Sequence, residues 1–313
     1  MKFSVFLPQG FVFELAGRSD PVEAFDAMVR VARAVDDAGY DTLWVADHFM
    51  TAMPSQEMMF ECWTTVAALT RETRRVRIGQ LVTCNGYRNP ALQAKMASTV
   101  DVMAGGRYTF GIGSGYYEPE FTSYGYPFPD SSERLRQLRE AVQVILALWT
   151  EEEATFEGRY YQVRGAINQP KGVQRPHIPL LVAGGGEKVT LKIVAQYADA
   201  CNVTDTPAEL ERKFAVLKKH CAEVGRDYDA IHRTVQTHCV IADDEAEARS
   251  RIPQWAPAVF PGDIGDYGLI GTVDTIRERI AAYEAAGVQE LVISFPDTVA
   301  LDSVKRFADE FIA

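Results

Sequence analysis

The sequence has no long apolar run and has fewer basic than acidic residues. Of its 313 residues, 32 are Lys or Arg and 43 are Asp or Glu, so the formal net charge is −11. The basic residues are scattered, and the positive surface that would neutralise nucleic acid phosphates is missing. No segment approaches the ~20 apolar residues that span a bilayer, and the opening MKFSVFLPQG lacks the features of a signal peptide. We therefore expect a cytoplasmic protein that binds neither nucleic acid nor membranes.

The sequence is also poor in metal-binding and hydrolase patterns. Its five cysteines are odd in number and widely spaced, which favours neither a disulfide framework nor a CxxC zinc site. His232 and His238 stand six residues apart, and no third ligand is spaced with them. Gly113-Ser114-Gly115 lacks the spacing of a nucleophile elbow. We expect no metal ion and no serine-hydrolase chemistry.

Short apolar runs alternate with longer helix-period runs along the whole chain. With 47% apolar and 24% charged residues, the composition is that of a globular protein. Eight β/α pairs can be counted, and such alternation is typical of a parallel sheet. We predict an α/β fold, a TIM (β/α)8 barrel, as a single domain over residues 1–313, with an open doubly wound sheet as the alternative. The expected strands are Phe3–Leu7, Thr42–Ala46, Val76–Val82, Tyr108–Ile112, Pro179–Ala183, Ala200–Val203, Thr234–Ile241 and Glu290–Ser294.

A helical pattern follows each expected strand. The helices are predicted at Pro21–Gly39, Phe60–Thr70, Pro90–Met103, Ser132–Trp149, Glu187–Tyr197, Pro207–Val224, Thr272–Ala286 and Val299–Ile312. Three segments exceed a simple βα connection: Ser114–Asp130 after strand 4, Glu151–Arg175 before strand 5, and Asp243–Gly271 after strand 7. Glu151–Arg175 contains a hairpin-like TFEGRYYQVRG. Because long loops usually carry function, we expect Glu151–Arg175 and Asp243–Gly271 at the carboxyl-terminal side of the barrel.

Polar residues follow the second and third strands. Asp47 and His48 end the second strand, where an imidazole in the barrel mouth can exchange a proton near neutral pH. Cys84 and Asn85 follow the third strand among small polar groups that let a flat ring approach the backbone. The simpler interpretation is that the Asp-His pair only caps its strand.

Glycine-rich runs follow the fourth and fifth strands. The run containing Gly113 is not a dinucleotide fingerprint, because its third glycine is displaced, but it permits close approach to a ligand with Tyr116 and Glu118 behind it. Gly184-Gly185-Gly186 follows a strand and opens a predicted helix, where backbone N–H groups can bind phosphate and Lys188 can add charge. A flexible turn without a ligand is the alternative for the second run.

Taken together, these motifs resemble the bacterial luciferase-like monooxygenase superfamily, and within it the branch of coenzyme F420-dependent oxidoreductases. The resemblance rests on DTLWVADHF, TCNGYRNPALQAKMASTVDVMAGGRYTFGIGSGYYEPEF, LLVAGGGEKVTLKIVAQYADACNV and GTVDTIRERIAAYEAAGVQELVISF. It implies a TIM barrel, commonly a homodimer, with a flavin or deazaflavin in the barrel mouth. It also implies a non-prolyl cis peptide after the third strand, here expected at Cys84–Asn85, and a phosphate tail held by the three glycines and Thr204.

The resemblance implies an active-site role for His48. Two positions depart from the sugar-phosphate dehydrogenases of this branch, because Ala52 stands where they have tryptophan and Tyr116 where they have a catalytic glutamate. We therefore expect an oxidoreductase that uses reduced coenzyme F420 to transfer a hydride to an electron-poor small molecule, with His48 donating the proton and Tyr116 and Glu118 shaping the substrate side. The alternatives are an FMN-dependent monooxygenase on the same scaffold and a non-catalytic cofactor-binding protein.

Overall fold

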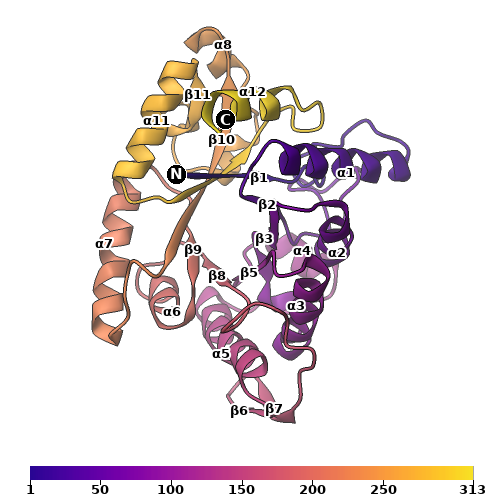
Figure 1. Cartoon of the computed structure of the whole chain (residues 1–313), viewed down its shortest axis with the longest axis vertical. Coiled ribbons are helices and arrows are strands. Elements are labelled where there is room, and N and C mark those ends of the chain that lie inside the picture. The colour runs from indigo at the N-terminus through magenta and orange to yellow at the C-terminus, as the bar shows by residue number, and fades with distance from the viewer. Residues whose placement is uncertain (313) are drawn as a thin grey trace.

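Eight parallel strands close into a barrel in the computed structural model, which describes residues 1–312 (Figure 1). The strands pair in chain order, and β12 pairs back with β1. The predicted TIM barrel is confirmed, and the open doubly wound sheet is wrong. The barrel strands are β1 (Lys2–Phe6), β2 (Thr42–Val45), β3 (Arg77–Gln80), β5 (Tyr108–Gly113), β8 (Leu180–Ala183), β9 (Ala200–Asn202), β10 (His232–Ile241) and β12 (Glu290–Ser294).

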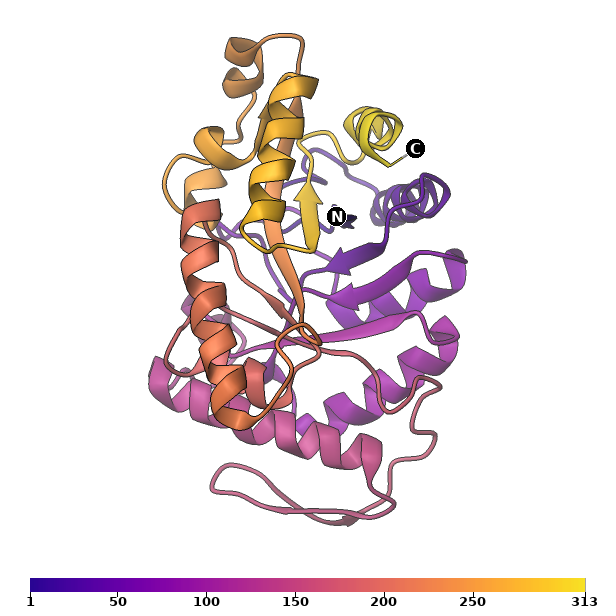
Figure 2. The same ribbon diagram turned by 60° about the vertical axis from the view of Figure 1, so that its left-hand side comes forward.

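Helices surround the strands and bury their apolar stripes against them (Figure 2). Asp20 starts the first helix because its carboxylate accepts the N–H groups of Val22 and Glu23, while Pro21 occupies the first turn. The outer helices are α1 (Pro21–Asp37), α2 (Cys62–Glu72), α3 (Pro90–Ala104), α5 (Ser131–Thr150), α6 (Thr190–Tyr197), α7 (Pro207–Val224), α11 (Val273–Ala285) and α12 (Asp302–Phe311). None of the helices in residues 1–312 is both long and apolar enough to cross a membrane.

The three segments predicted to exceed simple βα connections contain additional helices or strands. The hairpin-like sequence forms an antiparallel pair, β6 (Ala154–Glu157) and β7 (Gln162–Ala166), as predicted. The connection after β5 contains α4 (Glu118–Ser123). The connection after β10 contains α8 (Glu245–Ser250), α9 (Ala256–Val259), α10 (Ile264–Tyr267) and β11 (Leu269–Gly271), while β3 is followed by the short strand β4 (Thr83–Cys84) and a 3-10 turn (Asn85–Tyr87).

The predicted location of the Glu151–Arg175 insertion is wrong. This segment follows α5, which runs antiparallel to the strands and therefore ends at the amino-terminal side of the barrel. There Gln174 Nε2 donates to the carbonyl of Tyr108, the first residue of β5, at 2.7 Å. Figure 1 shows β6 and β7 beside α5, at the end of the molecule farthest from α8. Only the hairpin tip returns toward the strand ends, where Tyr161 Oη accepts from Asn85 Nδ2 at 3.1 Å.

A buried carboxylate joins the first and last strands inside the barrel. Glu290 of β12 accepts hydrogen bonds from Ser4 Oγ of β1 at 2.7 Å and from Trp44 Nε1 of β2 at 3.0 Å. Its second oxygen lies 2.8 Å from His232 Nε2 of β10. The carboxylate on β12 therefore contacts side chains from three other strands. These contacts add to the backbone pairing of β12 with β1 that closes the barrel.

Candidate active site

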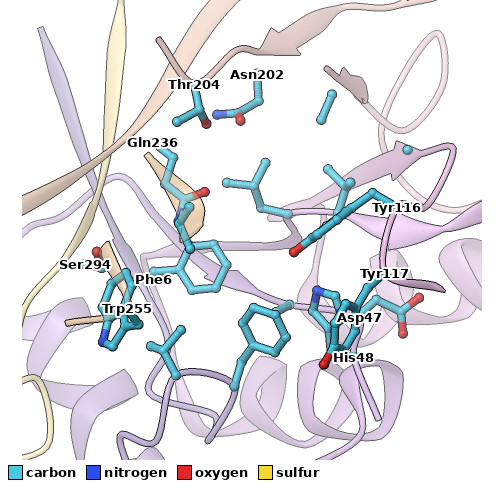
Figure 3. Close-up of a pocket in the computed structure, with 18 of the residues that line it drawn as sticks. Phe6, Asp47, His48, Tyr116, Tyr117, Asn202, Thr204, Gln236, Trp255 and Ser294 are labelled. Carbon is cyan, nitrogen blue, oxygen red and sulfur yellow. The ribbon is translucent and has the colours of Figure 1, made fainter. Parts of the chain in front are cut away.

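A cavity of about 700 Å³ lies at the carboxyl ends of the barrel strands (Figure 3). This is the position expected for the active site of a TIM barrel. Residues at or after the ends of all eight barrel strands contribute to its wall. The insertion after β10 contributes Trp255 and Arg251. The predicted position of Asp243–Gly271 on this side of the barrel is therefore confirmed.

The structure brings most of the predicted site residues together around this cavity. Those that line it are Asp47, His48, Cys84, Gly113, Tyr116, Gly184, Gly185 and Thr204. Glu118 is exposed at the start of α4, and neither it nor Gly186 is among the lining residues. Lys188 is also exposed and does not line the cavity, and α6 begins at Thr190, three residues after the predicted start at Glu187. Asn85 lines a second cavity, of about 530 Å³, between the 3-10 turn, the start of α5 and the hairpin tip.

His48 is held by Glu120 rather than by its neighbour Asp47. Its Nδ1 lies 2.9 Å from Glu120 Oε2, which also accepts from Tyr87 Oη at 2.6 Å. The ring of Phe11 stacks on the imidazole, with 3.9 Å between centroids and 11° between planes. Glu120 thus fixes the imidazole at Nδ1, and Phe11 fixes it from one face. The other ring nitrogen, Nε2, remains available to a ligand in the cavity.

The Glu120 carboxylate is fully buried yet remains ionised. Burial alone would raise its pKa, but the hydrogen bonds from His48 and Tyr87, together with the backbone N–H of Phe49, outweigh burial and hold the pKa below its usual range. Met50 N donates to the same oxygen as Phe49 at 3.0 Å. The buried carboxylate thus orients the imidazole of His48 for proton transfer at its other ring nitrogen, Nε2.

Asp47 organises the backbone beside the cavity. Its carboxylate receives both terminal nitrogens of Arg88, at 2.7 and 3.1 Å. It also accepts from Thr83 Oγ1 at 2.9 Å and from the Cys84 N–H at 2.8 Å. Arg88 therefore neutralises the charge of Asp47. The hydrogen bonds from Thr83 and Cys84 to Asp47 hold the segment that follows β3 in place.

The segment after β3 contains the non-prolyl cis peptide, at Leu81–Val82. The expected position, Cys84–Asn85, is wrong by three residues, because β3 ends at Gln80 and the chain then forms the separate strand β4. Val82 lies directly against β5, since a Cβ at Gly113 would lie 2.8 Å from Val82 Cγ2. The glycine at position 113 thus admits the Val82 side chain to the cavity wall.

A lysine other than the predicted Lys188 lies beside the turn after β8. Gly184 has φ of 125°, a conformation that favours glycine, and its N–H donates to the Asn202 carbonyl at 3.0 Å. A Cβ at Gly185 would lie 2.7 Å from Lys213 Nζ, so the absence of a side chain at this position lets the ammonium approach the turn. Lys213 is paired with Asp205 at 2.6 Å, and both side chains are largely buried. Lys213 is thus a buried cation beside Gly185, although neither Lys213 nor Lys188 is among the residues that line the cavity.

Several site residues were missed by sequence reasoning although their motifs were examined. Glu120 lies two residues after the predicted Glu118, and Tyr87 and Arg88 lie in the run after the third strand. The two glutamates differ in burial: Glu120 is on the buried face of α4, whereas Glu118 faces solvent. Phe11 and Lys213 lie in segments to which no chemistry was assigned.

Comparison with known proteins places this architecture among oxidoreductases. A family model described as luciferase-like monooxygenase matches residues 1–266. An F420-dependent glucose-6-phosphate dehydrogenase of Kineococcus radiotolerans is 32% identical over 226 residues, which cover 71% of this chain and 66% of that relative, just under two thirds. An FMNH(2)-dependent dimethylsulfone monooxygenase of Pseudomonas putida is 27% identical, covering 85% of this chain and 82% of the relative. A solved F420-dependent secondary alcohol dehydrogenase in complex with an F420-acetone adduct has the same fold, with a TM-score of 0.83 and 20% identity over 99% of this chain and 98% of that one.

Proposed function

Because the chain belongs to the luciferase-like monooxygenase family, we propose that it is an oxidoreductase that uses reduced coenzyme F420 to transfer a hydride to an electron-poor small molecule. One observation carries the proposal: the buried His48–Glu120 pair and the glycine turn after β8 border the same cavity of about 700 Å³. Figure 3 places His48 across the cavity from Thr204 and Asn202, which follow and end β9. A proton donor and an anion-binding turn thus lie within reach of one elongated ligand.

The residues present fit a deazaflavin with an anionic tail. Val82 and the small residues Thr83 and Gly113 leave a backbone-lined wall suited to a flat ring. The close approach that glycine permits between Gly185 and Lys213 supplies a buried ammonium for a phosphate. When bound, the cofactor supplies a two-electron hydride, which the side chains around this cavity cannot provide.

The protein itself supplies the proton and the alignment. Glu120 keeps the imidazole of His48 oriented, so that Nε2 can donate to a substrate atom that gains electron density. The ring of Phe11 stacks on the imidazole and restricts its rotation. The two departures at Ala52 and Tyr116 support a substrate other than glucose 6-phosphate.

An FMN-dependent monooxygenase is the second candidate, supported by the Pseudomonas relative. The two functions share the ring site and differ in the tail of the cofactor. Titration of the purified protein with coenzyme F420 and with FMN, followed by ring absorbance and fluorescence, distinguishes them. We expect F420 to bind at least about tenfold more tightly, since its longer anionic tail can use the turn after β8. Equal affinities, or FMN bound at full occupancy after purification, would contradict the F420 proposal.

A further inference from the structure

We infer that the cavity selects an uncharged ring compound bearing a carbonyl group, and that Trp255 is the residue that selects it. This inference rests on the proposed function and specifies its substrate class. It comes from the part of the cavity made by Phe6, Phe13, Trp255 and Phe295, here termed the aromatic wall. Figure 3 shows Phe6, Trp255 and Ser294 grouped across the cavity from His48 and Tyr116.

Aromatic side chains line both sides of the cavity. After β3 and β5 they are the tyrosines Tyr87, Tyr116 and Tyr117, beside small residues such as Thr83 and Gly113. The aromatic wall is made of phenylalanines and Trp255, from the β1 segment, from the end of β12 and from the insertion after β10. Aromatic faces bury a large apolar area against a ligand and favour other rings in stacked or edge-on contact. The aromatic wall therefore fits a ring compound.

The polar groups beside the aromatic wall are predominantly neutral. Gln236 and Ser294 line the cavity there and provide an amide N–H and a hydroxyl. The Glu14 carboxyl is directed back to its own turn, where it accepts from Val12 N at 2.9 Å, and desolvation by burial raises its pKa to about 7, against the opposing backbone hydrogen bonds. Neutral donors of this kind match the oxygen of a carbonyl group.

Cations are scarce around the cavity. Within residues 1–312, Arg251 is the single Lys or Arg that lines it, and its side chain is exposed and paired with Glu247. A phosphate or carboxylate against the aromatic wall would lose its hydration without gaining a buried counter-charge, and such a loss is costly. The substrate group bound there is therefore not a phosphate or a carboxylate.

Trp255 is held in place from behind by a buried neutral imidazole. The rings of His238 and Trp255 meet edge to face, with 5.4 Å between centroids and 80° between planes. His238 Nδ1 lies 2.9 Å from Ser294 Oγ, so one imidazole supports two cavity residues. Burial lowers the pKa of His238 to about 3, so the imidazole stays neutral at physiological pH and adds no charge behind the aromatic wall. The insertion after β10 thus presents a fixed indole to the ligand.

The tryptophan content of the chain allows a direct binding test. The chain has four tryptophans, and Trp44, Trp63 and Trp149 are buried in the core, whereas Trp255 lines the cavity. Menadione, an uncharged bicyclic quinone, serves as the probe. We expect menadione to quench tryptophan emission of the wild-type protein, and the quenched component to be absent from Trp255→Phe. Quenching that is equal in the two proteins would overturn the inference.

Calorimetric titration of the cofactor-free proteins measures selection. Trp255→Ala should weaken menadione binding at least about tenfold, whereas Trp255→Phe, which keeps a ring, should stay within about threefold of wild type. Circular dichroism and the thermal transition check that each variant is folded. If Trp255→Ala does not fold, the quenching experiment with wild type and Trp255→Phe still tests the inference. Menadione affinity that is unchanged in Trp255→Ala, or tighter binding of glucose 6-phosphate than of menadione by wild type, would overturn the inference.

The same proteins separate this inference from the cofactor proposal. The affinity for F420, measured by its fluorescence, should change less than about threefold in Trp255→Ala, because the tail is held after β8. If the wild type binds menadione through Trp255 but does not bind F420, the cofactor proposal fails and the substrate class stands. If it binds F420 but not menadione, the substrate class fails alone.

Discussion

The interaction between His48 and Glu120 illustrates how a buried charge is made tolerable at a single residue. Glu120 is fully buried, and an unpaired carboxylate there would be strongly destabilising. Four donors reach its two oxygens, from His48, Tyr87 and the backbone of residues 49 and 50. The same contacts that satisfy the carboxylate also orient the imidazole, so stability and proton transfer depend on one group.

We expect replacement of His48 by alanine to lower turnover by about 10²–10⁴-fold, the usual scale for general acid catalysis. F420 affinity should change little, because the tail-binding turn lies elsewhere. Glu120→Gln should cause a smaller loss, since a neutral amide replaces the carboxylate that orients the imidazole. Single-turnover oxidation of reduced F420 across pH measures both effects.

Glu118→Gln is the matched control, because Glu118 is on the same short helix but exposed. It should leave both the rate and its pH profile unchanged. A wild-type chemical rate in folded His48→Ala protein would exclude the proton-donor role. Loss of F420 binding in that variant would instead make His48 a ring-binding residue.

At the level of elements, the turn between β8 and α6 is shaped by what packs beneath it. Lys213 comes from α7, and its ammonium occupies the space that a side chain at Gly185 would fill. Asp205 neutralises it at 2.6 Å. A ligand phosphate can therefore use a buried, oriented cation, whereas the exposed Lys188 pays the full cost of ordering a flexible side chain.

Lys213→Met should weaken F420 binding by roughly 10–100-fold, as expected for loss of a charge-assisted hydrogen bond of about 1.5–3 kcal/mol. Lys188→Met, which removes the same charge three residues after Gly185, should change the affinity less than about threefold. Fluorescence titration with F420 measures both values. Equal effects of the two substitutions would contradict a dominant role for Lys213, and a larger effect of Lys188→Met would favour the sequence-based choice of Lys188.

The elements themselves were predictable because their signals are local. Apolar periodicity and caps such as Asp20 determine helices within a few residues, and the strand Glu290–Ser294 was predicted with its observed bounds. To predict on which side of the barrel the Glu151–Arg175 insertion lies, one must know the direction in which α5 runs. The partner of His48 was not predictable from its neighbours, because Glu120 is 72 residues away and the contact forms only when β2 and α4 meet in the barrel.

For the whole molecule, closure of the barrel depends on contacts between its two chain ends. Glu290 joins β12 to β1, β2 and β10 through Ser4, Trp44 and His232. The contacts to Ser4 and Trp44 join residues 286 and 246 positions apart, so they form only when the complete barrel assembles. Their loss should therefore affect the global free energy of unfolding rather than a local opening. The cavity at the opposite end of the strands inherits its geometry from this closure.

Glu290→Ala should therefore lower the free energy of unfolding by about 3–5 kcal/mol, because it leaves the buried donors of Ser4 and Trp44 without their acceptor and opens a cavity. Glu284→Ala is the matched control from the preceding helix: its carboxylate is half exposed and pairs with the amino terminus at 3.1 Å, so the expected loss is about 0–1 kcal/mol. Urea unfolding followed by circular dichroism and by tryptophan emission gives both values, with the buried Trp44 reporting on the closure. A Glu290→Ala midpoint close to that of Glu284→Ala would mean that backbone pairing between β1 and β12 closes the barrel without the carboxylate.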